Sequence, residues 1–182
     1  MKPAMVYMDR KTIRSQTKSK LSLFSRSNSG FGTISIKLSK MKAHDLPAMD
    51  PNGKADPYVM LILDPKELYE KKHQSARGLF KKVWPTSKTI QMNRNPDWGN
   101  ETLEIIMDKK TTAELHGAML LITVVDSDLT SEDDLIGTIQ INMAELLGPV
   151  TKKQTFELKE TLVKNGRERG TFECKLSVSL SK

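Results

Sequence analysis

The sequence of 182 residues has little cysteine and no long apolar run, and each shortage excludes a class of protein. A single cysteine, Cys174, cannot close an internal disulfide, which fits a reducing compartment. The longest apolar stretch, Ala118 to Val125, is far shorter than the ~20 residues that a membrane-spanning helix needs. Any contact with a membrane is therefore expected to be peripheral.

Signals for secretion and lipid attachment are also missing. The first residues, Met1 to Met5, contain no apolar segment of the kind found in secretory signals. Position 2 is Lys rather than Gly, and the chain ends Ser-Leu-Ser-Lys, so the motifs for myristoylation and prenylation are absent. We therefore expect a cytoplasmic protein.

Motifs for catalysis are missing as well. His44, His73 and His116 are scattered over predicted loops, no Ser or Cys motif surrounds them, and there is no Gly-rich phosphate-binding motif. Paired carboxylates can hydrolyse glycosides, but the acidic loops described below hold more Asp residues than that reaction uses. We expect that the protein is not an enzyme.

The positive charge is concentrated at the N-terminal end. Residues 1–30 carry seven Lys or Arg against one Asp, whereas the remaining 22 basic and 21 acidic groups almost balance. This segment is rich in Ser and Thr and lacks the period of a strand or a helix, so it is predicted to be a flexible arm. It is interpreted either as an inert solubilising tail or as a basic segment that is attracted to an anionic membrane. In the second case, phosphorylation of its Ser and Thr residues would weaken that attraction.

Residues 31–182 show short apolar and alternating segments separated by turn signals, which is typical of an antiparallel β-sandwich. The last segment illustrates the alternation, because Phe172, Cys174, Leu176, Val178 and Leu180 share one face and are predicted to be buried. Short helices are predicted after Asp64-Pro65 and after Asn142. Eight strands are predicted, over residues 33–38, 58–63, 88–92, 102–107, 118–125, 136–141, 155–158 and 171–180.

Two acidic loops carry the functional signal. The first contains Asp50 and Asp56, and the second contains Asp126, Asp128 and Asp134 directly after the most apolar strand. Like charges repel and raise one another's pKa, and a hard divalent cation removes that cost. Calcium suits Asp oxygens on two loops better than magnesium, which requires a tight octahedron, and no His or Cys lies nearby to favour zinc.

Two other interpretations of these loops were considered. A helix-loop-helix calcium site requires Gly at the sixth loop position and Glu at the twelfth, and counting from Asp126 these positions are Ser131 and Gly137. That motif is therefore excluded. The other interpretation is that both loops are ordinary solvated acidic turns. It requires that two Asp-rich loops occur at strand ends of the same sandwich by coincidence.

The loops also resemble a known family. The segment Leu46–Val59, with Asp50, Gly53 and Asp56-Pro57-Tyr58, is similar to the first calcium loop of C2 domains such as those of synaptotagmins and classical protein kinases C. Lys88-Thr89-Ile90 with Asn95-Pro96-Asp97-Trp98 resembles the next landmark of the family, and residues 126–137 resemble its third loop. The resemblance covers residues 31–180 and favours the arrangement called type II, in which the first strand leads into the first calcium loop.

The resemblance implies a set of ligands. The side chains of Asp50, Asp56, Asp126, Asp128 and Asp134 would bind about two to three Ca²⁺ ions, with additional oxygens from Met49, Ser127 and Ser131. It also implies binding to phosphatidylserine-type membranes, recruitment to their cytosolic face, and a place in signalling or vesicle trafficking.

The expected lipid contacts are less defined by the pattern. Leu129 lies at a loop tip, and Tyr58 and Lys88 match members of the family that bind phosphoinositide, with Lys71 and Lys72 in a nearby basic insertion. The insertion is equally interpreted as a solvated basic loop. The tips carry few apolar residues, so mainly electrostatic, salt-sensitive docking is expected.

We expect a monomer that binds calcium and anionic phospholipid and does not bind nucleic acid, because the basic arm lacks interleaved aromatic residues. The alternative function is a C2-type protein-interaction module, with protein partners, whose calcium site is vestigial or purely regulatory.

Overall fold

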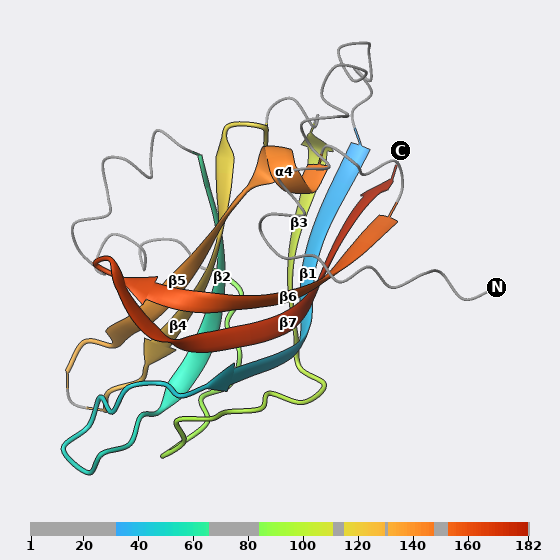
Figure 1. Cartoon of the computed structure of the whole chain (residues 1–182). Helices are drawn as coiled ribbons and strands as arrows, with labels where there is room; N and C mark the ends of the chain where they lie inside the picture. Colours follow the sequence, from blue (N-terminus) through green and yellow to red (C-terminus); the bar gives the residue numbers. More distant parts are fainter. Residues whose placement is uncertain (1–31, 66–83, 111–114, 130, 148–152, 182) are drawn as a thin grey trace.

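The computed structural model describes residues 32–65, 84–110, 115–129, 131–147 and 153–181. These residues form seven β-strands and one short helix (Figure 1). In chain order the elements are β1 (Gly32–His44), β2 (Pro57–Pro65), β3 (Thr102–Lys110), β4 (Ala118–Asp126), β5 (Asp134–Asn142), α4 (Met143–Leu147), β6 (Lys153–Lys164) and β7 (Arg167–Ser181). The predicted all-β fold is thereby confirmed.

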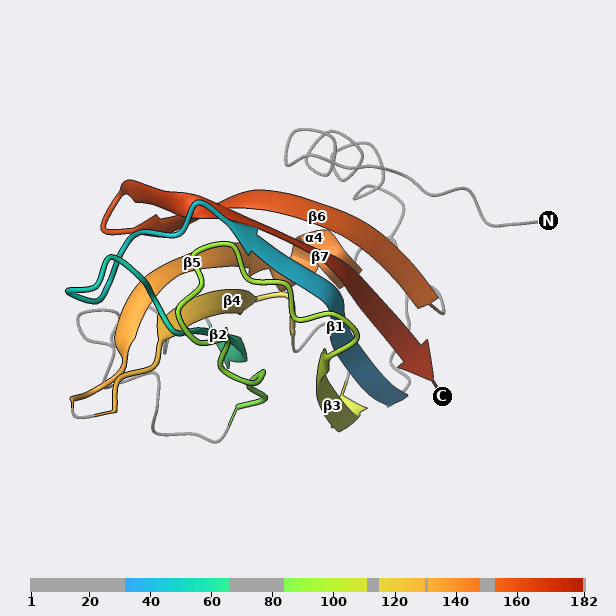
Figure 2. The same cartoon turned by 90° about the horizontal axis from the view of Figure 1, so that it is seen from below.

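The strands are hydrogen-bonded in the order β2-β4-β5-β6-β7-β1-β3, and every pair is antiparallel. β5 and β6 are joined only at Thr138 and Val163. The sheet folds over at this narrow junction, so that β6, β7, β1 and β3 form one layer and β2, β4 and β5 form the other (Figure 2). Among the described strands the first leads into the loop that carries Asp50, as the type II arrangement requires.

The core lies between the two layers and follows from alternation. In β7 the side chains of Phe172, Cys174, Leu176 and Val178 are buried as predicted, whereas Leu180 near the end of the strand is only partly buried. Burial also raises the pKa of the Cys174 thiol, which makes it a core residue and not a reactive one. β4 is buried almost throughout, because its other face packs with Tyr58, Met60 and Ile62 in a second apolar cluster.

The predicted count of eight strands is one too high for the described residues. The segment predicted as a strand over residues 88–92 contacts the start of β2 through a hydrogen bond from Ile90 N to Pro57 O (3.0 Å). Residues 85–87, just before it, lie beside β2, where Leu61 N donates to Pro85 O (3.0 Å) and Ser87 N to Val59 O (2.9 Å). The pairing is irregular because Pro85 has no N–H and because Val59 N donates to the Ser87 hydroxyl instead of a carbonyl (2.8 Å). Between this part of the chain and β2, the described residues form only an isolated β-bridge, between Met60 and Thr86.

The helix predicted after Asn142 is confirmed, since Asn142 Oδ1 accepts a hydrogen bond from Ala144 N at 2.9 Å, as a capping residue does. Asp64 and Pro65, predicted to start another helix, are the last residues of β2. The rest of that predicted helix, the basic insertion with Lys71 and Lys72, and the arm over residues 1–30 lie outside the described residues.

Candidate metal centre

Three loops meet at one end of the sandwich. They are residues 45–56 between β1 and β2, residues 91–101 before β3, and residues 127–133 between β4 and β5, and they lie toward the lower left of Figure 1. The strand β2 pairs with β4 from Pro57–Asp126 onward, so the first and third loops leave the sheet at neighbouring strand ends. A backbone hydrogen bond from Ser127 N to Asp56 O (3.0 Å) joins them directly.

A cluster of three carboxylates lies where these loops meet. One oxygen each from Asp50, Asp126 and Asp128 can be chosen so that all three lie within 4.8 Å of one another. Asp126 is only 2% exposed, whereas Asp50 and Asp128 are half-buried. The cluster contains carboxylates alone, which is the donor set that hard cations prefer.

The charge on Asp126 is poorly compensated. Burial raises the pKa of its carboxyl to about 6, the carboxylates of Asp50, Asp128 and Asp56 act in the same direction, and a hydrogen bond from Asp56 N to Asp126 Oδ1 (2.6 Å) opposes them. A buried carboxylate facing like charges costs free energy unless a cation neutralises it. The site therefore fits a divalent cation.

The other two predicted ligands border this cluster but are not part of it. Asp56 lies between the loops, because its N–H binds Asp126 and its Oδ1 accepts a hydrogen bond from Met92 N at 2.6 Å. Asp134 is exposed at the start of β5, in register with Asp126. Of the additional predicted ligands, Met49 and Ser127 adjoin cluster residues, and Ser131 is exposed in the third loop. Their role as ligands stays a prediction.

The first loop is held by its own turn. Gly53 N donates to Asp50 O (3.0 Å), Lys54 N donates to Asn52 Oδ1 (2.8 Å), and Asp50 N donates to Lys54 O (3.1 Å). Gly53 has φ +76°, a conformation that glycine adopts without strain. This turn sets the position of the Asp50 side chain before any ligand arrives.

The third loop is held by a residue that sequence analysis did not single out. Asp133 Oδ2 accepts a hydrogen bond from the Tyr58 hydroxyl (2.8 Å), and its Oδ1 accepts one from Asp128 N (3.1 Å). Burial and the contact with Asp133 raise the pKa of the Tyr58 hydroxyl. Asp133 thus connects β2 to the backbone of Asp128. No sequence motif marks this link, since it depends on which residues the fold brings together.

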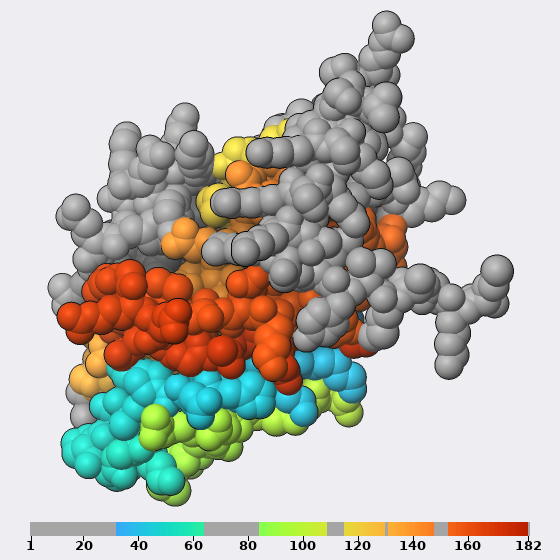
Figure 3. Space-filling view, viewed as in Figure 1, coloured from blue at the N-terminus to red at the C-terminus, as the bar shows by residue number. Residues whose placement is uncertain are grey.

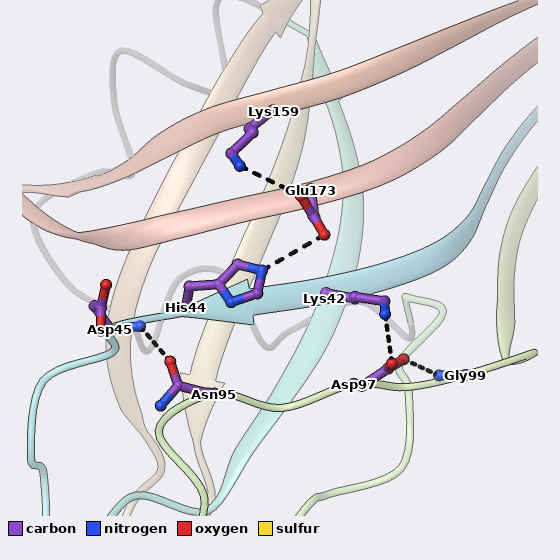
Figure 4. A network of polar contacts seen from close by, with 8 residues as sticks. All are labelled: Lys42, His44, Asp45, Asn95, Asp97, Gly99, Lys159 and Glu173. Atoms are coloured by element: carbon purple, nitrogen blue, oxygen red, sulfur yellow. Dashed lines mark hydrogen bonds and ion pairs between the residues drawn. The ribbon is translucent and has the colours of Figure 1, made fainter.

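The second loop is held against β1 by polar contacts (Figure 4). Lys42 Nζ lies 2.7 Å from Asp97 Oδ2 in an exposed ion pair. Each group stabilises the charged form of the other, so the pKa of Lys42 is raised and the pKa of Asp97 is lowered. Gly99 N donates to Asp97 Oδ1 (2.8 Å), and Asp45 N donates to Asn95 Oδ1 (2.9 Å). A further bond from Asn93 N to Ala55 O (2.8 Å) joins this loop to the first loop, next to the contact between Met92 N and Asp56.

The predicted lipid contacts are distributed unevenly. Leu129 is 97% exposed at the tip of the third loop, and Lys88 is exposed beside β2 with its N–H bound to Glu101 Oε1 (3.0 Å). Tyr58 is buried and its hydroxyl contacts Asp133. Met92 is a further apolar side chain at this end, 63% exposed, which sequence analysis missed because it lies in an irregular loop without a motif. Lys71 and Lys72 lie outside the described residues.

Within the part of the chain that the structure describes, no helix has the length and apolar composition needed to cross a membrane.

The sequence is similar to proteins that contain C2 domains or are named for lipid binding. Human multiple C2 and transmembrane domain-containing protein 1 is 33% identical over 152 residues, which are 82% of this chain and 13% of that protein. A calcium-dependent lipid-binding protein from Arabidopsis thaliana is 27% identical over 140 residues, which are 75% of this chain and 23% of that protein. The chain thus spans less than a quarter of the length of either relative.

A solved structure and a family model complete the comparison. A C2 domain of plant extended synaptotagmin 1 has a TM-score of 0.58 and 19% sequence identity, covering 83% of this chain and 96% of that domain, a likeness that shows the fold. The model of the family described as C2 domain matches residues 34–158. The chain therefore belongs to the C2-domain family.

Proposed function

We propose that this protein binds anionic phospholipid membranes in a calcium-dependent manner. The observation that carries the proposal is the cluster of Asp50, Asp126 and Asp128, whose oxygens lie within 4.8 Å of one another at the open end of the sandwich. The relative from Arabidopsis thaliana that is named a calcium-dependent lipid-binding protein supports the same assignment.

The chain's own residues set up the electrostatics. Without a cation, the three carboxylates, with Asp56 and Asp134 beside them, make the loop end negative and unfavourable to an anionic surface. Asp126 and Asp128 leave β4 together, and Asp133 holds the backbone of Asp128 in place. Bound Ca²⁺ would supply positive charge and vacant coordination positions for lipid oxygens. The five predicted ligands would hold it.

The apolar side chains at the same end add a second attraction. Leu129 and Met92 are both strongly exposed, and they extend from the third and second loops. A side chain of this size contributes roughly 1–3 kcal/mol when it leaves water completely. Because few apolar side chains are exposed on the described loops, we propose a peripheral and reversible docking on a cytosolic membrane face, in which electrostatic attraction dominates.

Co-sedimentation with vesicles tests this function. Wild-type protein is expected to sediment with phosphatidylserine vesicles in calcium and to stay soluble in chelator or with phosphatidylcholine alone. The double variant Asp126→Asn, Asp128→Asn is expected to lose the calcium response. A matched control is Glu104→Gln, Asp108→Asn, which removes the same charge from exposed positions of β3 and is expected to behave as wild type.

The two outcomes separate the alternatives. Binding to vesicles that ignores both calcium and the Asp126/Asp128 substitutions would contradict the calcium-dependent function. No binding to vesicles under any condition, by a folded protein, would favour the protein-interaction module instead.

A further inference from the structure

The turn between β6 and β7 is a rigid basic hairpin. Asn165 and Gly166 have φ +52° and +74°, as the two central residues of a type I′ turn do, and Lys164 pairs with Arg167 on either side of them. The dipeptide Asn-Gly is a strong hairpin signal that sequence analysis did not use, since it predicted the flanking strands to be shorter. We call Lys164–Arg169 the basic hairpin.

The fold fixes this hairpin beside the candidate metal centre. A Cβ added at Gly170 would lie 2.6 Å from the backbone oxygen of His44, at the start of the first loop. A Cβ added at Gly137 would lie 2.9 Å from Leu162 Cβ and 3.4 Å from Arg169 Cβ, just after the third loop. The base of the basic hairpin is thus packed against the bases of both loops that carry the Asp cluster.

The hairpin and the two loops extend toward the same end of the molecule. In Figures 1 and 2 the β6–β7 turn and the loops at residues 45–56 and 127–133 all lie at the left of the view. In the space-filling view the red surface of the hairpin lies above the turquoise surface of the first loop along that side (Figure 3). A planar surface that meets the two loops would meet the hairpin too.

The hairpin carries three cations and one carboxylate, Glu168, which pairs with Val163 and therefore lies on the opposite face from Lys164 and Arg167. Lys164, Arg167 and Arg169 lie on one face, because Lys164 is opposite Arg167 and Arg169 follows two residues later in an extended strand. Arg167 is exposed, and no ion pair joins Lys164 or Arg167 to a carboxylate in the described part of the chain. Arg169 reaches Met49 Sδ at 3.6 Å, and its buried Nε has no hydrogen-bond partner among the same residues.

Two cations directly opposite each other destabilise a hairpin, and an anion between them removes that cost. We infer that the basic hairpin is a second membrane contact, in which Lys164, Arg167 and Arg169 bind the phosphate groups of anionic lipids while the loops dock through calcium. This inference rests on the proposed function. It assigns the membrane a footprint wider than the metal centre and partly independent of calcium.

Vesicle partition of matched charge variants tests the inference. In calcium, Lys164→Gln, Arg167→Gln is expected to bind phosphatidylserine vesicles roughly tenfold more weakly than wild type. The control Lys37→Gln, Lys153→Gln removes two cations from β1 and the far end of β6, and is expected to bind as wild type. Equal binding by the hairpin and control variants would overturn the inference.

Two further measurements locate the effect. Calcium titrations without vesicles are expected to be identical for wild type and the hairpin variant, and a loss of vesicle binding explained by weaker calcium binding would overturn the inference. A spin label at Asn165→Cys, at the exposed tip of the hairpin, is expected to reach the headgroup layer on docking, whereas one at Lys153→Cys stays in water. Cys174 is buried and leaves the introduced thiol as the accessible one. A label at position 165 that stays in water would also overturn it.

Failure of the proposed function gives a different pattern. If wild-type protein does not bind vesicles in calcium at all, the function is wrong and the hairpin loses its basis. If wild type binds, the Asp126/Asp128 variant does not, and the hairpin variant equals its control, then only the hairpin inference fails. Free inorganic phosphate is expected to compete weakly, because it lacks the density of charge of a leaflet.

Discussion

At the scale of single residues, the site depends on hydrogen bonds between loops that are distant in sequence. Asp56 in the first loop contacts Asp126 and Met92 N, and Tyr58 in β2 contacts Asp133 in the third loop. These contacts orient Asp126 and Asp128 before a cation arrives. Preorganisation of this kind strengthens binding by reducing the entropy lost when the loops become ordered.

The link between Tyr58 and Asp133 gives a prediction at this scale. Tyr58→Phe removes the hydroxyl that holds Asp133, and with it the support of Asp128 N, while the ring stays in its apolar cluster. Calcium affinity measured by calorimetry is expected to fall roughly two- to tenfold, the net value of one hydrogen bond. Asp133→Asn tests the other partner and is expected to weaken binding in the same direction.

The control for this pair is Ser35→Ala, which removes an exposed hydrogen bond to Glu104 on the outer face of β1. It is expected to leave calcium affinity unchanged. Calcium affinity of Tyr58→Phe equal to that of wild type would show that the third loop does not need this support.

At the scale of elements, close contacts at two glycines decide how the hairpin of β6 and β7 meets the loops. Gly170 has φ +96° and lies under the backbone oxygens of His44 and Asp45. Gly137 lies where β5 crosses β6, the junction at which the sheet folds over. Both contacts are short because no side chain separates the backbones.

Gly170→Ala is therefore expected to destabilise the protein by about 2–4 kcal/mol, since it adds a clash with the His44 oxygen to the strain of a positive φ. Urea unfolding measures this free energy. Gly99→Ala is the matched control, because Gly99 has φ +59° but no atom within 4 Å of the added Cβ, and it is expected to cost about 1 kcal/mol. Equal losses for the two variants would show that the contact with His44 is unimportant.

Elements also show what the sequence could and could not predict. Alternation in β7 and the apolar run in β4 identified the buried faces correctly, because burial sets those patterns directly. The prediction of a strand over residues 88–92 was wrong, since residues 85–87 just before it pair irregularly with β2 and the segment itself meets β2 through the bond from Ile90 N to Pro57 O. The cluster of Asp50, Asp126 and Asp128 followed from spacing and resemblance, whereas the roles of Asp133 and Met92 depend on contacts that only the fold creates.

At the scale of the whole molecule, one end of the sandwich concentrates the chemistry. The Asp cluster, the exposed side chains of Leu129 and Met92, and the basic hairpin all lie there. The outer face of β6 and β7 carries ion pairs such as Lys159–Glu173 and Lys175–Glu157. The proposed function therefore predicts that one end of the molecule, rather than a face of its sheets, meets the membrane.

The central claim is that the cluster around Asp126 is a calcium site, and the thermal unfolding of wild type and Asp126→Asn in chelator and in calcium tests it most directly. The raised pKa of Asp126 means that the folded state holds this proton more tightly than the unfolded chain, so stability falls as pH rises from 3.8 through about 6. At pH 7 in chelator, removal of this charge is expected to raise the unfolding temperature, because Asn Oδ1 keeps the hydrogen bond from Asp56 N.

In calcium the order is expected to reverse. Ligands that bind only the folded state raise the unfolding temperature, so wild type is expected to gain stability with calcium concentration and Asp126→Asn to gain little or none. We therefore predict that Asp126→Asn has the higher unfolding temperature in chelator and that wild type has the higher unfolding temperature in calcium. A wild-type unfolding temperature that is the same in chelator and in millimolar calcium would contradict it.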